Sequence, residues 1–246
     1  MCAALALEPC PDRVRTAAPS RSDTGPVLRV GDGGLHRNGC WLFRHLSFEL
    51  VAGEVTAITG PSGAGKSSLL ACLGRTLALD EGRVEWNRFP ARSRPAWVHQ
   101  DLQLVSQATV LANVLMARLG RYPWWQTLWS FPRAERRAAW SVLADLGLAN
   151  LAPKLVCETS GGEQQRTAVA RALFADAPLV LADEPVANLN EELAVLVLER
   201  LREEARQRGA AVVCVLHHEA QVVRFADAVL RLGPRWPNGA QWERLA

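Results

Sequence analysis

The most informative stretch of this sequence is Gly60-Pro61-Ser62-Gly63-Ala64-Gly65-Lys66-Ser67. It fits the pattern Gly-x-x-x-x-Gly-Lys-Ser/Thr in full, with the apolar run 55–59 before it and a helical pattern over 67–73 after it. Glycines let successive backbone N–H groups curl around phosphate oxygens, and the N-terminus of the following helix adds its positive end. The segment therefore predicts a phosphate-binding loop between a buried strand and a helix.

Two polar side chains at the end of this loop suit the chemistry of a nucleotide. Lys66 would place a positive charge beside the β- and γ-phosphates, and the Ser67 hydroxyl can ligate Mg²⁺. Lysine is rare in this chain, where Lys154 is the other one. The presence of a lysine at this position favours a functional role for Lys66.

A pair of carboxylates follows a second predicted strand. The apolar run 179–181 leads through Ala182 into Asp183 and Glu184. Asp183 is placed to hold Mg²⁺ through water, as the second half of a P-loop site, and Glu184 can orient and polarise the attacking water. An acidic pair after a strand is ordinarily a solvated turn, but together with a phosphate loop it predicts a catalytic site.

A second anion site is predicted at Ser160-Gly161-Gly162-Glu163-Gln164. Its two glycines free backbone N–H groups at the start of a helix, beside the serine hydroxyl. Capping alone would need only a serine or a glycine, not Ser-Gly-Gly followed by Glu-Gln-Gln-Arg. Two phosphate sites on one chain make sense if the second faces a nucleotide held by another copy.

Two further polar residues also follow strand patterns. Gln100 comes after the run 96–99, and His217 comes after the run 211–216. Ligands gather at the carboxyl ends of the strands in open parallel sheets, so both residues are candidates for the same site. A histidine taken alone would more often be a core or turn residue.

Strand and helix patterns alternate along most of the chain. Strand-like segments begin at Val27, and the helical spacing of apolar residues over 191–208 stops at Gly209. Strand, helix and strand in this order indicate right-handed β-α-β units. We therefore expect an α/β fold with a mostly parallel core sheet and an antiparallel N-terminal β region.

The region 101–177 differs from its flanks because helical patterns dominate it. Residues 134–146 place Ala138, Val142 and Leu146 on one face, and Gly147 follows. The cluster of Trp124, Trp125 and Trp129 is either part of a small helical core or an exposed patch for docking a partner. We expect one domain over 27–246, with 27–100 and 178–246 as its core and 101–177 as an inserted helical subdomain.

Composition limits the remaining possibilities. The chain has 246 residues, of which 49% are hydrophobic and 22% charged, and this ordinary globular composition argues against a fibrous or disordered protein. Its net charge of +3 is too small to indicate nucleic-acid binding. Residues 1–26 contain four prolines and are expected to be a disordered leader or a misassigned start. No stretch approaches the roughly 18–20 apolar residues that cross a bilayer, so any membrane role should come through a partner.

The six cysteines are scattered without a Cys-x-x-Cys pair or the spacing of a metal site. We expect reduced thiols, with Cys72 and Cys214 in the core because both lie in apolar stretches.

Taken in this order, these motifs resemble the ATP-binding cassette (ABC) ATPase family over about residues 27–232. The resemblance implies a P-loop NTPase of ABC type that uses ATP and Mg²⁺. The loop from Gly60 through Ser68 would hold the nucleotide, and Ser67, Gln100 and Asp183 would hold the metal. The resemblance also implies that Glu184, His217 and Gln100 are catalytic.

Further roles follow from the same resemblance. The segment 160–164 would be the family signature, which contacts the γ-phosphate across a dimer interface. Gln100 would link Mg²⁺ and water to the helical subdomain, and His217 would contact the γ-phosphate.

Within the family, the sequence is most similar to the ATPase subunit of phosphonate importers. The similarity is carried by residues 60–70, 113–120, 146–148, 181–187 and, above all, the insert 118–132. The segments Ser-Gly-Gly-Glu-Gln-Gln-Arg and Asn188-Leu189 equally resemble ATPases of lipoprotein-release and macrolide-efflux systems, which are the alternative.

The resemblance implies partners and a location. We expect a homodimer, bound to transmembrane permease subunits at the cytoplasmic face of a bacterial inner membrane. A periplasmic binding protein would be an indirect partner, and no nucleic acid is expected. ABC ATPases outside transport usually carry long coiled-coil insertions or two cassettes, and this sequence has neither.

Four features depart from the family pattern. Thr159 stands where leucine is usual, and Asn190 stands where the D-loop normally has aspartate. Loss of that charge raises a third possibility, a nucleotide-gated module with slow turnover. His36 aligns nearest the usual adenine-stacking aromatic residue, with Trp41 as the alternative, and residues 233–246 are not expected to continue the terminal strand pattern.

Overall fold

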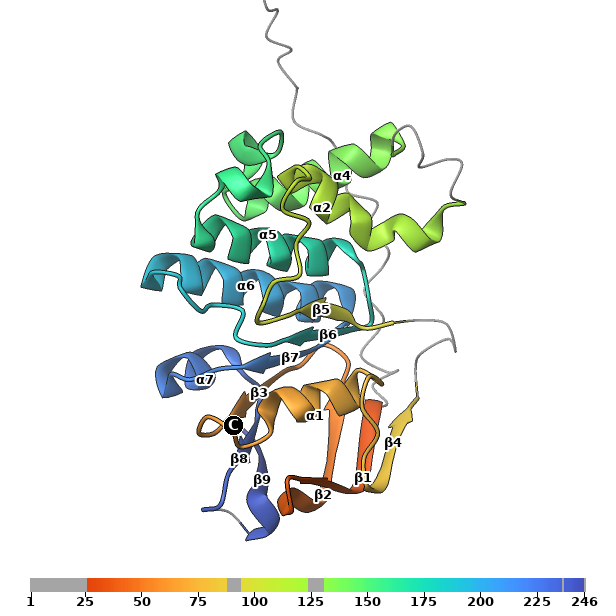
Figure 1. Cartoon of the computed structure of the whole chain (residues 1–246), viewed down its shortest axis with the longest axis vertical. Helices are drawn as coiled ribbons and strands as arrows, with labels where there is room; N and C mark the ends of the chain where they lie inside the picture. The colour runs from red at the N-terminus through yellow and green to blue at the C-terminus, as the bar shows by residue number, and fades with distance from the viewer. Residues whose placement is uncertain (1–25, 88–93, 124–130, 236, 246) are drawn as a thin grey trace, which may run out of the picture.

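The computed structural model describes residues 26–87, 94–123, 131–235 and 237–245. The predicted leader, apart from Pro26, and the cluster of Trp124, Trp125 and Trp129 lie outside these ranges. The chain forms helices at one end, antiparallel strands at the other and a larger sheet between them (Figure 1).

The larger sheet has six strands in the order β5-β6-β7-β3-β8-β9. In that order the strands are β5 (Ala96–Val98), β6 (Leu179–Ala182), β7 (Ala211–Val215), β3 (Val55–Thr59), β8 (Ala228–Leu232) and β9 (Ala240–Arg244). The first five run parallel, and β9 runs antiparallel to β8. The strands predicted at 55–59, 96–99, 179–181 and 211–216 are confirmed to within one residue at each end.

A second, antiparallel sheet of three strands precedes the helical region. It has the order β2-β1-β4 and consists of β1 (Pro26–Arg37), β2 (Cys40–Val51) and β4 (Glu81–Trp86). Asn38 and Gly39 connect β1 to β2 with φ values of 52° and 80°, the left-handed pair that a two-residue hairpin requires. The antiparallel N-terminal β region is therefore confirmed.

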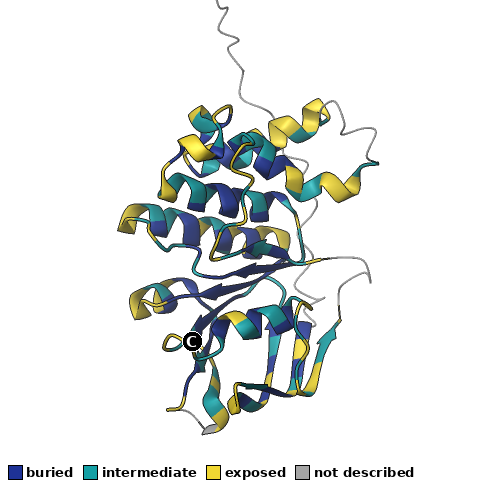
Figure 2. Ribbon diagram, in the orientation of Figure 1, coloured by how far each residue is buried: buried dark blue, intermediate teal, exposed yellow. Residues whose placement is uncertain are grey.

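Successive residues of the central strands contribute to two separate cores. Val180 and Ala182 pack with the buried faces of α5 (Gly161–Phe174) and α6 (Glu191–Arg208). Leu179 and Leu181 pack instead with α1 (Lys66–Leu73) and the antiparallel sheet. The central strands are dark blue along their length in Figure 2 because both of their faces are covered.

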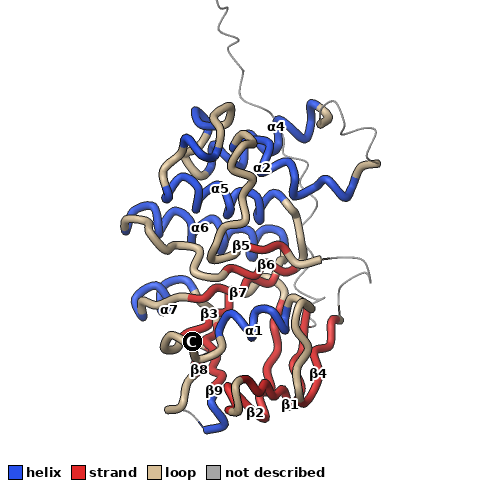
Figure 3. The backbone as a smooth tube through the Cα atoms, viewed as in Figure 1, coloured by secondary structure: helices blue, strands red, loops and turns tan. Residues whose placement is uncertain are grey.

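Helices predominate between the two halves of the core. They are α2 (Val110–Leu115), η2 (Met116–Arg121), α4 (Arg133–Asp145), η3 (Ala149–Leu151), η4 (Val156–Glu158) and α5. α2, α4 and α5 pack against one another, and Figure 3 shows these blue segments gathered at one end of the molecule. Among the residues that the structure describes, no helix has the length and apolar character needed to span a membrane.

The buried face of α4 is one residue away from the expected one. Leu146, just after the helix, is fully buried as expected, but within α4 the fully buried residues are Ala139 and Leu143, whereas Ala138 is exposed and Val142 is half-buried. Both pairs have helical spacing, so the pattern alone fits either face. Packing against α2 and α5 selects the face with Ala139 and Leu143.

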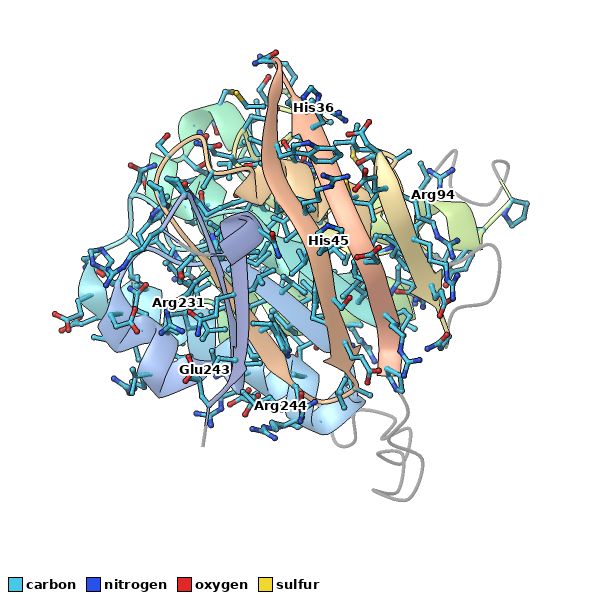
Figure 4. The ribbon with its side chains drawn as sticks, turned by 90° about the horizontal axis from the view of Figure 1, so that it is seen from below. His36, His45, Arg94, Arg231, Glu243 and Arg244 are labelled. Atoms are coloured by element: carbon cyan, nitrogen blue, oxygen red, sulfur yellow. The ribbon has the colours of Figure 1, made fainter. Side chains whose placement is uncertain are left out.

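The expectation that residues 233–246 would not continue the strand pattern was wrong. Leu230 of β8 lies opposite Trp242 of β9, whose indole stacks on Phe48 with ring centroids 5.1 Å apart. Arg231 and Glu243 form an ion pair of 2.9 Å across the two strands (Figure 4). Because β9 has only five residues and its inner face is only half-buried, its two-residue period did not stand out in the sequence.

Candidate active site

The sheet brings the predicted site residues to one edge. β5, β6, β7 and β3 are neighbours, and their carboxyl ends lead to Gln100, to Asp183 and Glu184, to His217 and to the phosphate loop. Because carboxyl ends of parallel strands meet at the same edge, these residues share one region of the surface.

The phosphate loop joins β3 to α1, and its backbone needs glycine. Gly60 has φ +147°, and a Cβ there would lie 2.3 Å from the Leu232 carbonyl oxygen at the end of β8. Gly65 has φ +92° and lies against the Leu42 side chain. Bulk at either position would displace the loop, which explains these two glycines of the motif.

Lys66 is the buried cation of this loop, with 7% of its surface exposed. Its Nζ donates to the carbonyl oxygens of Gly60 and Pro61, both at 2.9 Å. These partners are neutral, so the bonds position the ammonium without cancelling its charge. Ser67 is exposed and Ser68 half-buried in the first turn of α1, next to the loop.

The carboxylate pair lies where β6 ends. Asp183 is buried, and its backbone N–H donates to the Val98 carbonyl oxygen at 2.8 Å, which extends the pairing of β5 and β6 up to the acid. Glu184 has φ +53°, a left-handed conformation that is unfavourable for a side chain other than glycine. Its Oε1 lies 2.7 Å from His217 Nε2, so the structure joins two of the predicted catalytic residues.

Gln165 was not singled out in the sequence analysis. It is buried on α5, and its Nε2 donates to the Glu184 carbonyl oxygen at 3.0 Å. This bond ties the strained backbone of Glu184 to the helix that begins with the signature motif. A polar residue on the buried face of α5 is the signal that could have indicated it.

Gln100 is exposed and lies two residues beyond the end of β5. The preceding residue, His99, stacks on Trp97 with ring centroids 4.8 Å apart. Burial lowers the pKa of His99, so the neutral ring is favoured beside the sheet. The backbone just before Gln100 is therefore held by packing on β5, and Gln100 lies at the edge of the sheet.

The signature segment forms the start of α5. Ser160 caps the helix in a reciprocal box with Glu163: the Ser160 N–H donates to Glu163 Oε2 at 2.7 Å and the Glu163 N–H donates to Ser160 Oγ at 3.4 Å. The bond from Ser160 lowers the pKa of Glu163. Gln164 Nε2 donates to the carbonyl oxygens of Val156 and Thr159. Capping thus occupies Ser160 and Glu163.

The two glycines of the signature have different surroundings. A Cβ on Gly161 would meet open space, whereas one on Gly162 would lie 3.2 Å from the Leu189 side chain. Gly161 is thus required neither by packing nor by a positive φ. Its exposed backbone is compatible with a ligand.

A pocket of about 420 Å³ lies beside the phosphate loop. Its walls include Trp41 and Arg44 of β2, Gly63 of the phosphate loop and Asn238 of the loop before β9. The Arg44 guanidinium lies 4.6 Å from the centroid of the Trp41 ring. His36 is not among the lining residues; it lies near the tip of the β1–β2 hairpin and contacts Trp41 edge-on at 5.2 Å (Figure 4).

The fold and the loop define a class of protein. A glycine-rich loop that ends in Lys-Ser, placed between a buried parallel strand and a helix, is the P-loop of nucleoside triphosphatases. The mostly parallel sheet, the antiparallel sheet and the inserted helices are the architecture expected of the ABC type.

Comparison with known proteins identifies the family. The sequence profile described as ABC transporter matches residues 43–187. The phosphonates import ATP-binding protein PhnC of Escherichia coli O157:H7 is 37% identical over 198 residues, which cover 73% of this chain and 75% of that protein. The protein of the same name from Shigella sonnei is 36% identical over 198 residues, with the same coverage of both chains. The chain belongs to the ABC transporter family.

Solved structures agree with this result. The dimeric structure of the ATP-binding cassette MJ0796, in a post-hydrolysis state bound to ADP and Pi, has a TM-score of 0.74 and 26% identity over 89% of this chain and 99% of that one. A second dimeric structure of MJ0796, described as a bacterial ABC transporter cassette, has a TM-score of 0.75 and 25% identity with the same coverage. The predicted fold class and family are therefore confirmed.

Proposed function

We propose that this chain is the ATP-hydrolysing subunit of a membrane ABC transporter that imports phosphonate or a related phosphorus oxyanion. The observation that carries ATP hydrolysis is the meeting of the phosphate loop, Asp183, Glu184 and His217 at one sheet edge. The cargo is supported by the 37% identity to a protein named as a phosphonate importer subunit. The chain would act at the cytoplasmic face of a bacterial inner membrane, bound to permease subunits and indirectly to a periplasmic binding protein.

The phosphates of ATP would lie in the loop from Gly60 to Ser68. Lys66 is already held by two loop carbonyls, so its charge is oriented before the nucleotide arrives. The base would enter the adjoining pocket and stack on Trp41, because this ring lines the pocket and His36 does not. His36 would support Trp41 from its edge.

The residues present fit Mg²⁺. Ser67, Gln100 and Asp183 offer hydroxyl, amide and carboxylate oxygens, which are the hard ligands that this ion prefers. When bound, the ion would neutralise charge on the phosphates. The backbone of Asp183 is held by its hydrogen bond to β5, so the point from which its side chain extends is fixed.

Glu184 and His217 would carry the chemistry. The Glu184 carboxylate would orient a water and accept its proton as the water attacks the γ-phosphate. His217 Nε2 lies 2.7 Å from that carboxylate and its side chain is half-exposed, so it can hold the acid and also reach a phosphate oxygen. The strained backbone of Glu184 fixes the direction in which its side chain leaves β6.

The signature would act on the nucleotide of a second copy. α5 packs on the opposite face of the central sheet from α1, so each motif begins in a different layer (Figure 1). In a homodimer, Ser160, Gly161, Gly162, Glu163 and Gln164 would face the γ-phosphate of the partner's nucleotide. The dimeric structures of MJ0796 support the homodimer itself.

Replacement of Glu184 tests hydrolysis. We expect Glu184→Gln to bind ATP with near wild-type affinity but to lose hydrolysis, because the amide cannot accept the proton from water. With ATP the variant should accumulate as a dimer, measured by light scattering. Glu243→Gln is the matched control on the exposed face of β9, and it should leave turnover unchanged. Near wild-type turnover in Glu184→Gln would move the catalytic role to another residue, and His217 would be tested next.

Growth tests the cargo. Deletion of the gene should abolish growth on a phosphonate or phosphite as the sole phosphorus source and spare growth on phosphate. Undiminished phosphonate uptake combined with a defect in lipoprotein sorting would favour the lipoprotein-release alternative.

A further inference from the structure

Two consecutive residues after Gln100 have left-handed backbone conformations. Leu102 has φ +58° and Gln103 has φ +45°, and neither is glycine. The Leu102 N–H donates to the His99 carbonyl oxygen at 2.9 Å, and the Gln103 N–H donates to the Asp101 carbonyl oxygen at 2.7 Å. A three-residue turn with a positive φ at its centre is rare and strained, so contacts from outside the turn must stabilise it.

Arg171 makes such contacts. Its Nη2 donates to the Leu102 carbonyl oxygen at 2.7 Å, and its Nη1 donates to the Gln103 carbonyl oxygen at 2.6 Å. Burial lowers the pKa of the Arg171 guanidinium, and the nearby Asp101 carboxylate opposes that shift. A partly desolvated cation on two carbonyl oxygens makes charge-assisted bonds, which are stronger than neutral ones.

The helix that carries Arg171 also contacts the catalytic strand. Near the start of α5, Gln165 donates to the Glu184 carbonyl oxygen, and in its last turn Arg171 holds Leu102 and Gln103. A single rigid element therefore holds the main chain behind Glu184 and the main chain behind Gln100.

The far end of the same loop has a separate anchor. Asn113 of α2 is fully buried and exchanges hydrogen bonds with the backbone N–H and carbonyl of Val105, at 2.8 and 3.0 Å. Asn113 therefore fixes where the loop joins the helical region. Arg171 acts nearer to Gln100, at the strained turn itself.

We infer that Arg171 is a positioning residue that sets the place of Gln100 by clamping the left-handed turn at Leu102 and Gln103 to α5. The inference rests on the proposed ATP hydrolysis and extends it to a residue outside the nucleotide site. Arg171 acts through the backbone, so a movement of α5 displaces Gln100 and the catalytic strand together.

Removal of the clamp is the first test, made on the full chain. Arg171→Gln should lower kcat by roughly tenfold, because small displacements of catalytic groups are costly. KM for ATP should stay within about twofold, since the interactions of the phosphate loop are unchanged. Hydrogen exchange of the Leu102 and Gln103 amides should accelerate, which reports on the turn without any reference to catalysis.

Relief of the strain is the second test. Glycine adopts a positive φ without steric cost, so Leu102→Gly with Gln103→Gly lets the turn form with less need of the clamp. In the Arg171→Gln background these glycines should recover at least half of the loss in kcat on a logarithmic scale. A purely structural role for Arg171 would not produce this rescue.

Arg166 provides a matched control on the same helix. Its guanidinium donates to the Leu146 carbonyl oxygen at 2.8 Å and does not contact the turn. If Arg166→Gln lowers kcat, the substitutions Leu102→Gly and Gln103→Gly should not restore it. Equal rescue of both arginine variants, or rescue of neither, would overturn the inference.

The experiment also covers a variant that fails to fold and a failure of the proposed function itself. If Arg171→Gln does not fold, Arg171→Lys replaces it, because lysine keeps the charge without the planar fork of donors. Its loss should be smaller and should show the same rescue. If the wild-type chain neither binds nor hydrolyses ATP, the proposed function fails. If the Leu102 and Gln103 amides exchange at the same rate in the Arg171 variant as in the wild type, the clamping role of Arg171 is rejected, whatever the outcome for the proposed function.

Discussion

The two lysines of this chain have opposite surroundings. Lys66 is buried and bonded to the phosphate loop, whereas Lys154 is exposed. Hydrogen bonds to charged groups contribute about 1.5–3 kcal/mol, so Lys66→Ala should weaken ATP binding by about tenfold or more. Lys154→Ala, measured in the same calorimetric titration, should bind ATP like the wild type. An affinity of Lys66→Ala within about threefold of wild type would reject the phosphate-loop assignment, because a tenfold change corresponds to 1.4 kcal/mol.

Asn190 has a structural role that the sequence analysis did not foresee. It is the N-cap of α6, and its side-chain oxygen accepts a hydrogen bond of 2.9 Å from the Leu193 N–H. Aspartate caps a helix as well as asparagine does, so Asn190→Asp should keep the stability of the chain. This separates the effect of charge on turnover from an effect on folding.

The charge itself should raise turnover. A charge-assisted hydrogen bond exceeds a neutral one by roughly 1 kcal/mol, or about fivefold in rate if felt in the transition state. We therefore expect kcat of Asn190→Asp at saturating ATP, measured in the assembled transporter, to rise by about this factor. An equal or lower kcat with unchanged thermal stability would show that the loop has adapted to asparagine.

Among the elements, β9 provides a direct test of the C-terminal part of the fold. Trp242 is half-buried and stacks on Phe48, whereas the neighbouring Gln241 is exposed. Trp242→Ala should lower the free energy of unfolding by about 2 kcal/mol, because part of a large apolar side chain is lost. Gln241→Ala should stay within about 0.5 kcal/mol of wild type in the same urea titration. Equal stability of both variants would mean that β9 does not pack as described.

The elements differ in how well the sequence predicts them. β3, β6 and β7 are buried on both faces, so they read as continuous apolar runs and were placed to within one residue. Ala138 and Val142 were wrongly placed on the buried face of α4, because its helical pattern fits two adjacent faces and packing against α2 and α5 selects one. β9 was missed because a short edge strand with one half-buried face leaves a weak pattern.

The candidate site was predictable to the extent that chemistry restricts residue type. The glycines and Lys66 of the phosphate loop leave a clear pattern, because Gly60 and Gly65 have a positive φ and close neighbours and Lys66 brings a cation to the loop. Arg171 left no such pattern, and Gln165 left only the weak one of a polar residue on the buried face of α5, since both act on main-chain atoms of residues distant in the sequence. The catalytic roles of Glu184, His217 and Gln100 stay predictions.

For the whole molecule, burial divides the described cysteines into two groups. Burial raises the pKa of the Cys72 thiol to about 11 and that of Cys214 to about 12, whereas Cys40 and Cys157 are exposed. The thiolate is the reactive form, so Cys72 and Cys214 should resist a maleimide at pH 8. The test relies on the predicted reduced state of these cysteines, because a maleimide reacts with free thiols.

The test uses a variant in which Cys2 and Cys10, outside the described residues, are replaced by serine. Mass spectrometry of the native variant should show labelling of Cys40 and Cys157, and labelling of Cys72 and Cys214 only in urea. Rapid native labelling of Cys214 would contradict its complete burial in the core that contains α5 and α6.

The sharing of single strands by two cores limits how this protein can change over generations. Because neighbouring residues of β6 face different cores, an insertion or deletion of one residue in that strand would exchange both sets of side chains at once. A point substitution in β6 can be compensated by changes in the one core that it faces, but a change in the length of the strand affects both cores. Recombination between related genes must therefore place its crossovers in the connections outside the strands. A lineage that exchanges the segment between β5 and β6 in this way replaces α2, α4 and α5 as one block, while the loop around Lys66 is inherited intact.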